Sequence, residues 1–388
     1  MKNRFHLYEI YFFAIFFFGY KIFIRKDGDE MKDLIITKVI KNLGVIYLNN
    51  PRKLNALNFE MIKKIREILE KWEDDENIKA VLFDSLTEKA FCSGGDLKDL
   101  YNNFINKDSC KRKDEFFATE FELDKYIASY KKPIISHWRG IVMGGGIGLS
   151  INSDYIISEE SVNWAMPETS LGFVPDVGVC NYISRLPKAL GHYVGILGRS
   201  LEASDLVKYN FSHVYIDSKD YEKLIEKLID LSEIYEGEEL IEKLKIEGEK
   251  YNLPVKETFV DKNYDKIEKY FNKDSLEEIY KSLEENLEDE FAREIYDDLK
   301  SRSQFMLQVQ FEKYFLCKNL TYHETVDLDL KVLNHALDVG KMEKGIRSKV
   351  IDKDYEPEWK EKSLEDVDMG EVKNLLGIEK TYKERKNI

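Results

Sequence analysis

Two carboxylates stand eight positions apart in the segment AMPETSLGFVPDVG, residues 165–178. Glu168 follows one proline and Asp176 follows another, and the residues around them are mostly apolar or glycine. A carboxylate in apolar surroundings gains a raised pKa, so it can exchange protons near neutral pH. The pair therefore indicates acid/base or nucleophilic chemistry. Taken alone, Asp176 could equally cap the helix that follows it, and Glu168 could be a solvated acid in a first helical turn.

Two glycine clusters could stabilise the charge that such chemistry develops. A triple glycine occurs in GIVMGGGIGLS, residues 140–150, and a glycine pair occurs in AFCSGGDL, residues 90–97. Glycine lets a ligand approach the main chain, whose unpaired N–H groups can bind a negatively charged oxygen. Glycines also serve tight turns and close packing, which is the commoner reason for a triple glycine on its own. Neither cluster fits the GxGxxG or GxxxxGK[ST] pattern, so dinucleotide and P-loop sites lack their motifs.

Four motifs, taken in order along the chain, resemble the crotonase (enoyl-CoA hydratase/isomerase) superfamily. They are NPRKLNALN, AFCSGGDL, GIVMGGGIGLS and AMPETSLGFVPDVG, and the resemblance extends from residue 33 to about residue 220. It implies a spiral core of repeated ββα units and an acyl-CoA substrate. It also implies an oxyanion hole, in which the main-chain N–H groups of Gly95 and Gly145 bind the thioester carbonyl oxygen.

The acidic residues distinguish the reactions of this superfamily. Its hydratases resemble one another in a GGGxE turn, whose Glu works with a second Glu elsewhere in the chain. This chain has Gly148 in place of the Glu of the turn and Glu168 in place of the second Glu. Asp176 stands where hydratases usually carry glycine. MPET with PDVG, and GIRSKVIDKDYEPEW at residues 345–359, are similar to the 3-hydroxyisobutyryl-CoA hydrolases. This similarity implies hydrolysis of a 3-hydroxyacyl-CoA thioester, as in valine breakdown, with Glu168 and Asp176 as catalytic residues.

Other residues of that substrate site map onto this chain by position. Glu120 in FATEFELD matches the substrate-contacting Glu of an EEYxLN pattern, and Gly145 would bind substrate through its amide. Arg52 and Lys53 lie where the family carries a basic residue near the CoA phosphates. Without the resemblance, Glu120 would be interpreted as one more charge on an exposed helix face. The resemblance implies no metal and no organic cofactor, because thioester hydrolysis uses only water.

The sequence leaves both the chemical route and the reaction class open. Glu168 could attack the carbonyl and form an anhydride, or it could draw a proton from water while Asp176 orients the 3-hydroxyl or assists the departing thiolate. The alternatives to a hydrolase are a hydratase or isomerase with a rearranged acid set, and an acyl-CoA-binding protein without turnover. Departures from the hydrolase pattern at residues 179–181 and at residues 301–304, which read SRSQ in place of SPxS, leave the acyl group unassigned.

The hydrophobic periodicity predicts the elements that must position these residues. Apolar runs predict strands, and apolar residues at helical spacing predict amphipathic helices. The predicted strands are 35–40, 43–50, 79–85 and 133–138, and the predicted helices include one around Ile62, Ile65, Leu69 and Trp72 and another over 117–127. Strands alternate with helices, so the fold class is α/β, and a C-terminal helical domain follows. We divide the chain into an N-terminal extension (1–30), a catalytic core (31–220) and that helical domain (221–388).

The extension differs from the rest of the chain. It is rich in aromatic residues, and its apolar run from Ile10 to Phe18 is too short to span a bilayer. Small residues at signal-peptide cleavage spacing do not follow the run. We expect either a misassigned start upstream of Met31 or a disordered or membrane-touching segment, with a signal anchor as the alternative.

Composition excludes several classes of protein. The 388 residues, 43% of them hydrophobic, can bury a sizeable core. A formal net charge of -14 argues against general affinity for nucleic acid, and no stable membrane partner is expected. Four cysteines without CxxC spacing fit a reducing cytoplasm, with Cys92 a small buried thiol and His137 a packed core residue. Crotonase relatives often form trimers, which leaves a homo-oligomer open, although the C-terminal helices could cover that surface.

Overall fold

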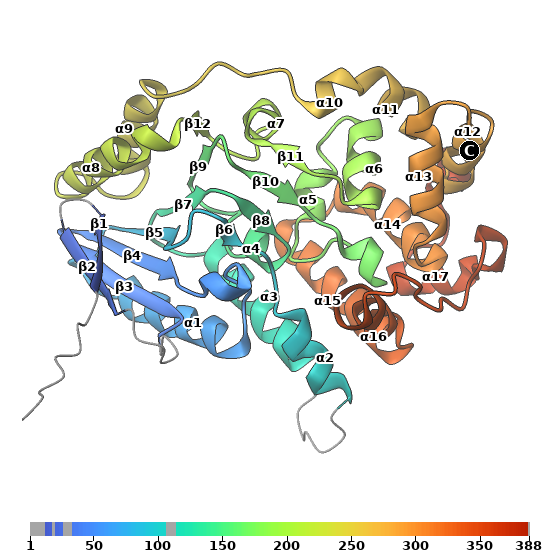
Figure 1. Cartoon of the computed structure of the whole chain (residues 1–388), viewed down its shortest axis with the longest axis horizontal. Helices are drawn as coiled ribbons and strands as arrows, with labels where there is room; N and C mark the ends of the chain where they lie inside the picture. The colour runs from blue at the N-terminus through green and yellow to red at the C-terminus, as the bar shows by residue number, and fades with distance from the viewer. Residues whose placement is uncertain (1–11, 18–19, 26–32, 106–113, 387–388) are drawn as a thin grey trace, which may run out of the picture.

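The computed structural model describes residues 12–17, 20–25, 33–105 and 114–386, and its strands form three sheets (Figure 1). The strands are β1 (Phe12–Phe17), β2 (Tyr20–Arg25), β3 (Ile35–Ile40), β4 (Leu43–Leu48), β5 (Ala80–Ser85), β6 (Ala90–Cys92), β7 (Ile134–Trp138), β8 (Ile141–Met143), β9 (Tyr155–Glu159), β10 (Asn163–Ala165), β11 (Leu201–Glu202) and β12 (Val214–Ile216). The strands predicted from the apolar runs are confirmed, with ends that differ by at most two residues.

The strands of the core alternate between two sheets. The larger sheet has the order β12-β9-β7-β5-β4-β3 and is parallel except for the β3–β4 hairpin; the smaller has the order β11-β10-β8-β6. Consecutive strands β5 and β6, β7 and β8, and β9 and β10 each place one member in each sheet and are followed by helix. This is the repeated ββα spiral that the resemblance implies. The two remaining strands, β1 and β2, pair antiparallel with each other.

Helices surround the two sheets, and in the described chain after β12 they are the only regular elements, joined by loops. They are α1 (Phe59–Glu73), α2 (Leu97–Ile105), α3 (Glu115–Ala128), α4 (Gly145–Gly148), α5 (Cys180–Ile183), α6 (Lys188–Leu197), α7 (Ala203–Lys208), α8 (Tyr221–Ser232), α9 (Gly237–Glu249), α10 (Phe259–Lys262), α11 (Tyr264–Phe271), α12 (Leu276–Glu284), α13 (Glu290–Lys300), α14 (Gln304–Cys317), α15 (Tyr322–Asp338), α16 (Lys341–Ile346), α17 (Met369–Leu376) and α18 (Tyr382–Lys386), with short turns η1 (Pro51–Lys53), η2 (Glu168–Leu171), η3 (Ser218–Asp220), η4 (Arg347–Asp352) and η5 (Leu364–Asp366). Both predicted helices are present, as α1 and α3.

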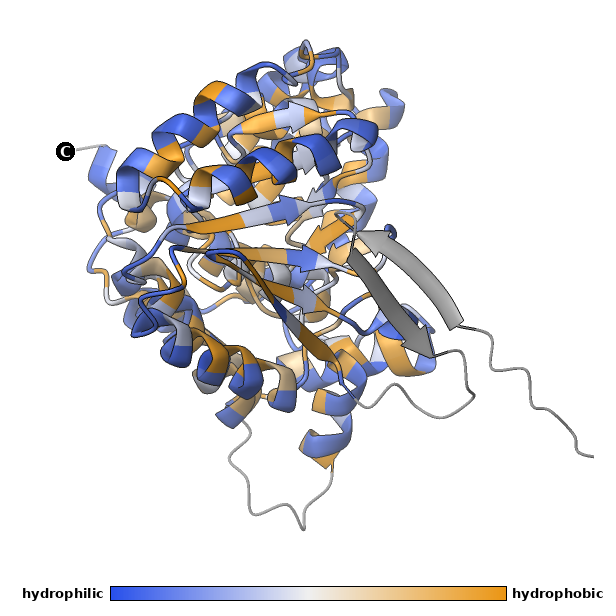
Figure 2. Ribbon diagram, turned by 90° about the vertical axis from the view of Figure 1, so that its left-hand side faces the viewer, coloured by the Kyte–Doolittle hydropathy of each residue, from blue (hydrophilic) through white to orange (hydrophobic). Residues whose placement is uncertain are grey.

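The larger sheet is buried on both faces, which explains why its strands read as continuous apolar runs. On one face, α8 and α9 pack through residues such as Leu224 and Leu244 against strand residues such as Leu82. The other face belongs to a second cluster that runs without a break from strand residues such as Phe83 to C-terminal helix residues such as Leu376. The C-terminal helices therefore share a core with the sheets. In Figure 2, hydrophobic (orange) stretches run along the strands and alternate with hydrophilic (blue) ones along the helices that flank them.

The expectations for residues 1–30 lie mostly outside the described residues. Within the described ranges, no helix combines the length and apolar character needed to cross a bilayer.

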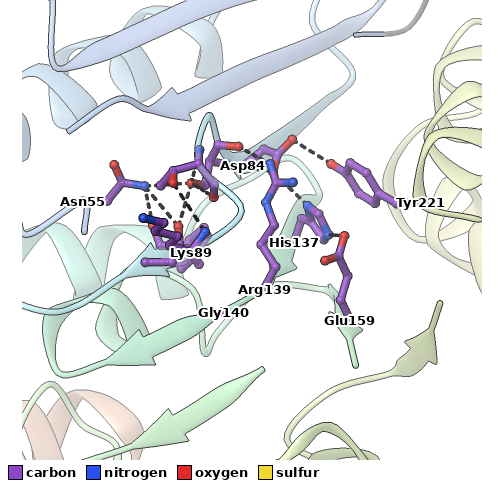
Figure 3. A network of polar contacts seen from close by, with 12 residues as sticks. Asn55, Asp84, Lys89, His137, Arg139, Gly140, Glu159 and Tyr221 are labelled. Carbon is purple, nitrogen blue, oxygen red and sulfur yellow. Dashed lines mark hydrogen bonds and ion pairs between the residues drawn. The ribbon is translucent and has the colours of Figure 1, made fainter. Parts of the chain in front are cut away.

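His137 on β7 is buried, as predicted, but it lies in a charged network rather than an apolar one (Figure 3). Its Nδ1 lies 2.8 Å from Asp84 Oδ1 and its Nε2 lies 2.9 Å from Glu159 Oε1. The Tyr221 ring stacks on the imidazole at 3.5 Å, and its hydroxyl donates to Asp84 Oδ2. Arg139 completes the network beside Asp84. Three strands and the first turn of α8 are thereby joined through one imidazole.

Candidate active site

One small cavity of about 80 Å³ is lined by both glycine loops and by the acidic residues singled out in the sequence. Gly95, Gly145, Glu120, Glu168 and Asp176 all line it. The remaining lining residues are small or apolar and are Ser93, Gly94, Leu97, Leu100, Phe117, Met143, Gly144, Pro167, Leu171 and Phe173. Segments from four separate parts of the chain therefore meet at one place.

The two glycine loops touch each other. Gly94 and Gly144 both have positive φ, +95° and +49°, a backbone region that favours glycine. A Cβ placed on Gly144 would lie 3.4 Å from the Gly94 Cα, which is an ordinary contact distance, and one on Gly94 would lie 3.3 Å from the Met143 carbonyl oxygen. Glycine is therefore favoured here chiefly by backbone conformation, at a place where the two loops are in contact.

Among the described residues, the main-chain hydrogen bonds around Gly95 and Gly145 leave the N–H groups of these two glycines without an acceptor. The Leu57 N–H donates to the Gly94 carbonyl, and the Asp96 N–H donates to the Leu57 carbonyl, both at 2.8 Å. This parallel bridge uses the groups on either side of Gly95, so the Gly95 N–H points away from it. Gly145 is the first residue of α4, where an N–H has no acceptor inside the helix.

Glu120 is buried on α3 and lies against the triple glycine. A Cβ on Gly145 would lie 1.9 Å from Glu120 Oε1, so any residue larger than glycine would collide with this carboxyl group. Glu120 is 3% exposed, so the interpretation of it as a solvated surface charge is wrong. Asp124, one helical turn further on, is equally buried and lies beside Gly148 and Val177. The sequence analysis did not single out Asp124.

Glu168 begins the turn η2, and its carboxyl group lies next to the glycine loop. A Cβ on Gly144 would lie 3.4 Å from Glu168 Oε1. Glu168 is buried, so it is not a solvated first-turn acid. The C-terminal motif holds this turn, because a Cβ on Gly345 would lie 2.1 Å from the Leu171 carbonyl oxygen and one on Gly172 would lie 2.7 Å from the Trp359 ring.

Arg302 lies in the segment SRSQ, which is one of the departures from the hydrolase pattern. It is the second residue of SRSQ and is buried beside the turn that carries Glu168. Its guanidinium donates to Thr169 Oγ1 and to the Leu197 carbonyl, and it pairs with Asp298. The changed motif therefore bears on how the Glu168 turn is supported.

Asp176 is buried in the tight turn before α5. The turn carries Val177 and Gly178 at positive φ, and no side chain caps α5. The interpretation of Asp176 as a helix cap is therefore wrong. Asp176 instead lines the cavity that the glycines of both loops also line.

Burial and mutual repulsion raise the pKa of every carboxyl group at this site. Burial first, and then the charge of Asp176, raises the pKa of Glu168 and of Glu120 well above the ordinary value. Burial, and then Asp329, raises the pKa of Asp176 to about 7. Burial first, and then the charge of Glu120, raises the pKa of Asp124 well above its ordinary value. At neutral pH the site therefore holds protons that ordinary carboxylates would have lost.

Three carboxyl oxygens at the site lack a hydrogen-bond partner. They are Glu120 Oε1, Asp124 Oδ2 and Glu168 Oε2, which receive no hydrogen bond from any residue in the described part of the chain. A buried carboxyl group without a partner destabilises the fold, so such a cluster indicates a site kept for ligand chemistry.

Gly148, which replaces the hydratase acid, has no room for a side chain. A Cβ there would lie 2.5 Å from Asp124 Oδ2 and 2.7 Å from Val177 Cβ. The space that a glutamate stem would need is therefore filled by two neighbours. Asp124 is not among the cavity-lining residues, so it does not present the missing acid to the cavity in the glutamate's place.

Arg52 and Lys53 lie outside the cavity, on the exposed turn η1. Lys53 Nζ is 2.5 Å from Asp96 Oδ2 and 3.7 Å from Asp99 Oδ1, so its charge is partly used beside the Gly95 loop. Cys92 is buried as predicted, and burial raises its pKa to about 12. Its thiol is therefore a poor nucleophile.

Comparison with known proteins identifies the family. The chain matches the family model described as enoyl-CoA hydratase/isomerase over residues 43–376. It is 31% identical over 347 residues to "3-hydroxyisobutyryl-CoA hydrolase, mitochondrial" of Xenopus laevis, which covers 89% of each chain. It is 29% identical over 352 residues to the human protein of the same name, which covers 90% of each. Since both names include "mitochondrial", the cytoplasmic location stays a prediction.

Two solved structures have the same fold. An enoyl-CoA hydratase from Rhodobacter sphaeroides superposes with a TM-score of 0.79 at 27% identity, over 89% of this chain and 98% of that one. A carnitinyl-CoA dehydratase from Mycobacterium thermoresistibile superposes with a TM-score of 0.78 at 24% identity, over 89% and 96%. These matches confirm the predicted crotonase-like architecture, and the chain belongs to the enoyl-CoA hydratase/isomerase family of the crotonase superfamily of enzymes.

Proposed function

We propose that the protein hydrolyses the thioester of a short 3-hydroxyacyl-CoA to the free acid and CoA, with 3-hydroxyisobutyryl-CoA as the first candidate. The observation that carries the proposal is the burial of Glu168 and Asp176 in one cavity with the glycines of both loops. The small volume of that cavity favours a short acyl group. The names of two relatives at about 30% identity support the choice of 3-hydroxyisobutyryl.

In the proposed reaction, the thioester carbonyl oxygen accepts hydrogen bonds from the Gly95 and Gly145 N–H groups. One such donor lowers the activation barrier by about 3 kcal/mol in comparable sites. In one route the ionised Glu168 attacks the carbonyl carbon, the carbon–sulfur bond breaks, and water later cleaves the anhydride. In the other, Glu168 takes a proton from a water that attacks the same carbon. Both routes require Glu168 without its proton.

Asp176 suits a second role because its pKa is about 7. Both the protonated and the ionised form are then available near neutral pH. The protonated form can donate to the departing CoA thiolate, and the ionised form can accept a hydrogen bond from the substrate's 3-hydroxyl. In this scheme Glu168 serves the attack on the thioester carbon, and Asp176 serves the departure of the CoA thiolate.

Two alternatives are less well supported. Hydration across a double bond needs an acid at position 148, and that position is glycine with its space filled by Asp124 and Val177. A protein that only bound acyl-CoA would gain nothing from several buried carboxyl groups without partners, since each one lowers stability. Hydrolysis, by contrast, gives the buried carboxyl groups a role in the reaction.

A substrate panel with a thiol-reactive dye tests the proposal. We expect CoA release from 3-hydroxyisobutyryl-CoA and 3-hydroxypropionyl-CoA, and slower release from isobutyryl-CoA, which lacks the hydroxyl. No release from either hydroxy substrate would remove the proposal. Turnover of crotonyl-CoA that persists in Asp176→Ala would favour a hydratase, and retained binding without reaction would favour a binding protein.

Single turnover in heavy-oxygen water addresses the route. Label in the Glu168 carboxyl group would support an anhydride that water cleaves at the protein carbonyl. Absence of label would leave direct attack by water, or cleavage at the acyl carbon, as the routes still open.

A further inference from the structure

The turn that carries Asp176 adopts a strained backbone. Val177 has φ of +50°, a region that β-branched residues rarely occupy, and Gly178 follows at +73°. Such a conformation persists only where the surrounding structure holds it in place. The relevant question is therefore which groups hold residues 175–178.

Three hydrogen bonds from the C-terminal helices hold this turn. Lys313 Nζ on α14 donates to the Pro175 carbonyl at 2.5 Å. The Tyr322 hydroxyl, at the start of α15, donates to the Val177 carbonyl at 3.0 Å. The Gly178 N–H donates to Asp329 Oδ2 on α15 at 2.8 Å. The main chain is thus fixed on both sides of Asp176 by residues more than 130 positions away.

Lys313 and Asp329 form an ion pair whose side chains are fully buried. A buried ion pair often stabilises a fold no better than an apolar pair of similar volume, because both charges lose their water. Here each charged group also bonds to the turn, Lys313 at residue 175 and Asp329 at residue 178. The pair therefore specifies the geometry of the turn in a way that an apolar pair could not.

We infer that Lys313 and Asp329 are positioning residues that set the place and the charge state of Asp176. The inference rests on the function proposed above. Lys313 is a cation that interacts with both Asp176 and Glu168, and it favours their ionised forms. The other titratable groups that face Asp176 are acidic: Glu120 and Asp124 from α3, Glu168 from η2 and Asp329 from α15. Lys313 also interacts electrostatically with the thiols of Cys180 and Cys317.

The test uses three variants of the full chain and one matched control. Lys313→Met removes the cation, Asp329→Asn keeps an acceptor for Gly178 but removes the charge, and Lys313→Met/Asp329→Leu replaces the pair by apolar side chains. The double variant guards against a single variant that fails to fold. Glu312→Gln is the control, because Glu312 is buried next to Lys313 on α14 but accepts from the Tyr382 N–H, away from the turn.

Two readouts separate positioning from simple stability. Hydrogen exchange at the Gly178 amide needs no substrate, and we expect it to accelerate in the double variant and not in the control. With 3-hydroxyisobutyryl-CoA, we expect kcat to fall about a hundredfold in the double variant with KM nearly unchanged. We expect the acid limb of the kcat profile to move to higher pH in Lys313→Met and not in Asp329→Asn.

The outcomes also separate this inference from the proposed function. Wild-type exchange at Gly178 together with wild-type kcat in the folded double variant would overturn the inference. If the wild-type protein releases no CoA at all, the proposed function fails, whereas faster exchange at Gly178 in the double variant would still support the hold on the turn.

Discussion

A methyl group added at Gly148 should disturb catalysis through Val177. Its carbon would lie 2.7 Å from Val177 Cβ, whereas carbon atoms pack at about 3.5 Å, so Val177 must move by roughly 0.8 Å. Val177 directly follows Asp176, so the Asp176 carboxyl group moves with it. Overpacking of this kind costs about 1–3 kcal/mol of stability, and a displacement near 1 Å costs roughly a hundredfold in rate. We therefore expect Gly148→Ala to be less stable and to hydrolyse its substrate about a hundredfold more slowly.

Urea unfolding followed by circular dichroism, and CoA release followed with a thiol-reactive dye, measure the two effects. Gly370→Ala is the control, because the nearest group to a Cβ there is a single side-chain oxygen at 3.0 Å. Val177→Gly added to Gly148→Ala should recover part of the stability, since it removes both the collision and the strained φ. Gly148→Glu should gain no hydration of crotonyl-CoA. Wild-type rate and stability in Gly148→Ala, or efficient hydration by Gly148→Glu, would refute the reasoning.

Three further predictions concern charge. Glu168 must lose its proton to act and its pKa is raised, so kcat/KM should rise with pH over a pH range well above that of an ordinary carboxyl group. Asp176→Asn removes a neighbouring negative charge, so it should move that rise to lower pH. A value of kcat/KM that is independent of pH between about 5 and 8 would contradict this prediction. Burial alone would lower the pKa of His137, but its carboxylate neighbours raise the pKa above the ordinary value. The stability that protonated His137 contributes is therefore complete below about pH 6.5 and is lost as pH rises through the folded-state pKa. His137→Gln should lower the free energy of unfolding by about 3–5 kcal/mol in urea at pH 6, and a loss at pH 6 no larger than that at pH 9 would disagree. If Arg52 and Lys53 bind CoA phosphates, replacing both by Ala should raise KM severalfold with little change in kcat, and an unchanged KM would remove them from the CoA site.

The main features of the core could be predicted from the sequence because their signals are local. Apolar runs gave the strands, and glycines gave the two loops whose close contact the structure confirms. The cavity also unites Glu120, Glu168 and Asp176, which the motifs had singled out separately. The sequence analysis missed Asp124. A signal for it existed, since Asp124 lies four residues after Glu120 and therefore on the same face of one helix.

Other features had no local signal. Lys313 and Asp329 contact the Asp176 turn across 138 and 151 residues. Lys313 follows Glu312 on α14 and Asp329 lies among other charged residues on α15, so no local pattern marks either residue. The environment of His137 was equally hidden, because its carboxylate partners come from two other strands of the sheet. Such contacts depend on which elements pack together, and that is decided by tertiary structure.

The most direct test of the account compares CoA release from 3-hydroxyisobutyryl-CoA by the wild-type protein and by Glu168→Gln, with substrate binding measured in parallel. Ordinary acid/base and nucleophilic roles predict that the wild-type protein releases CoA and that the variant binds the substrate but releases CoA ten- to thousands-fold more slowly. Equal rates in the two proteins would contradict the central claim that Glu168 acts on the thioester between the two glycine loops.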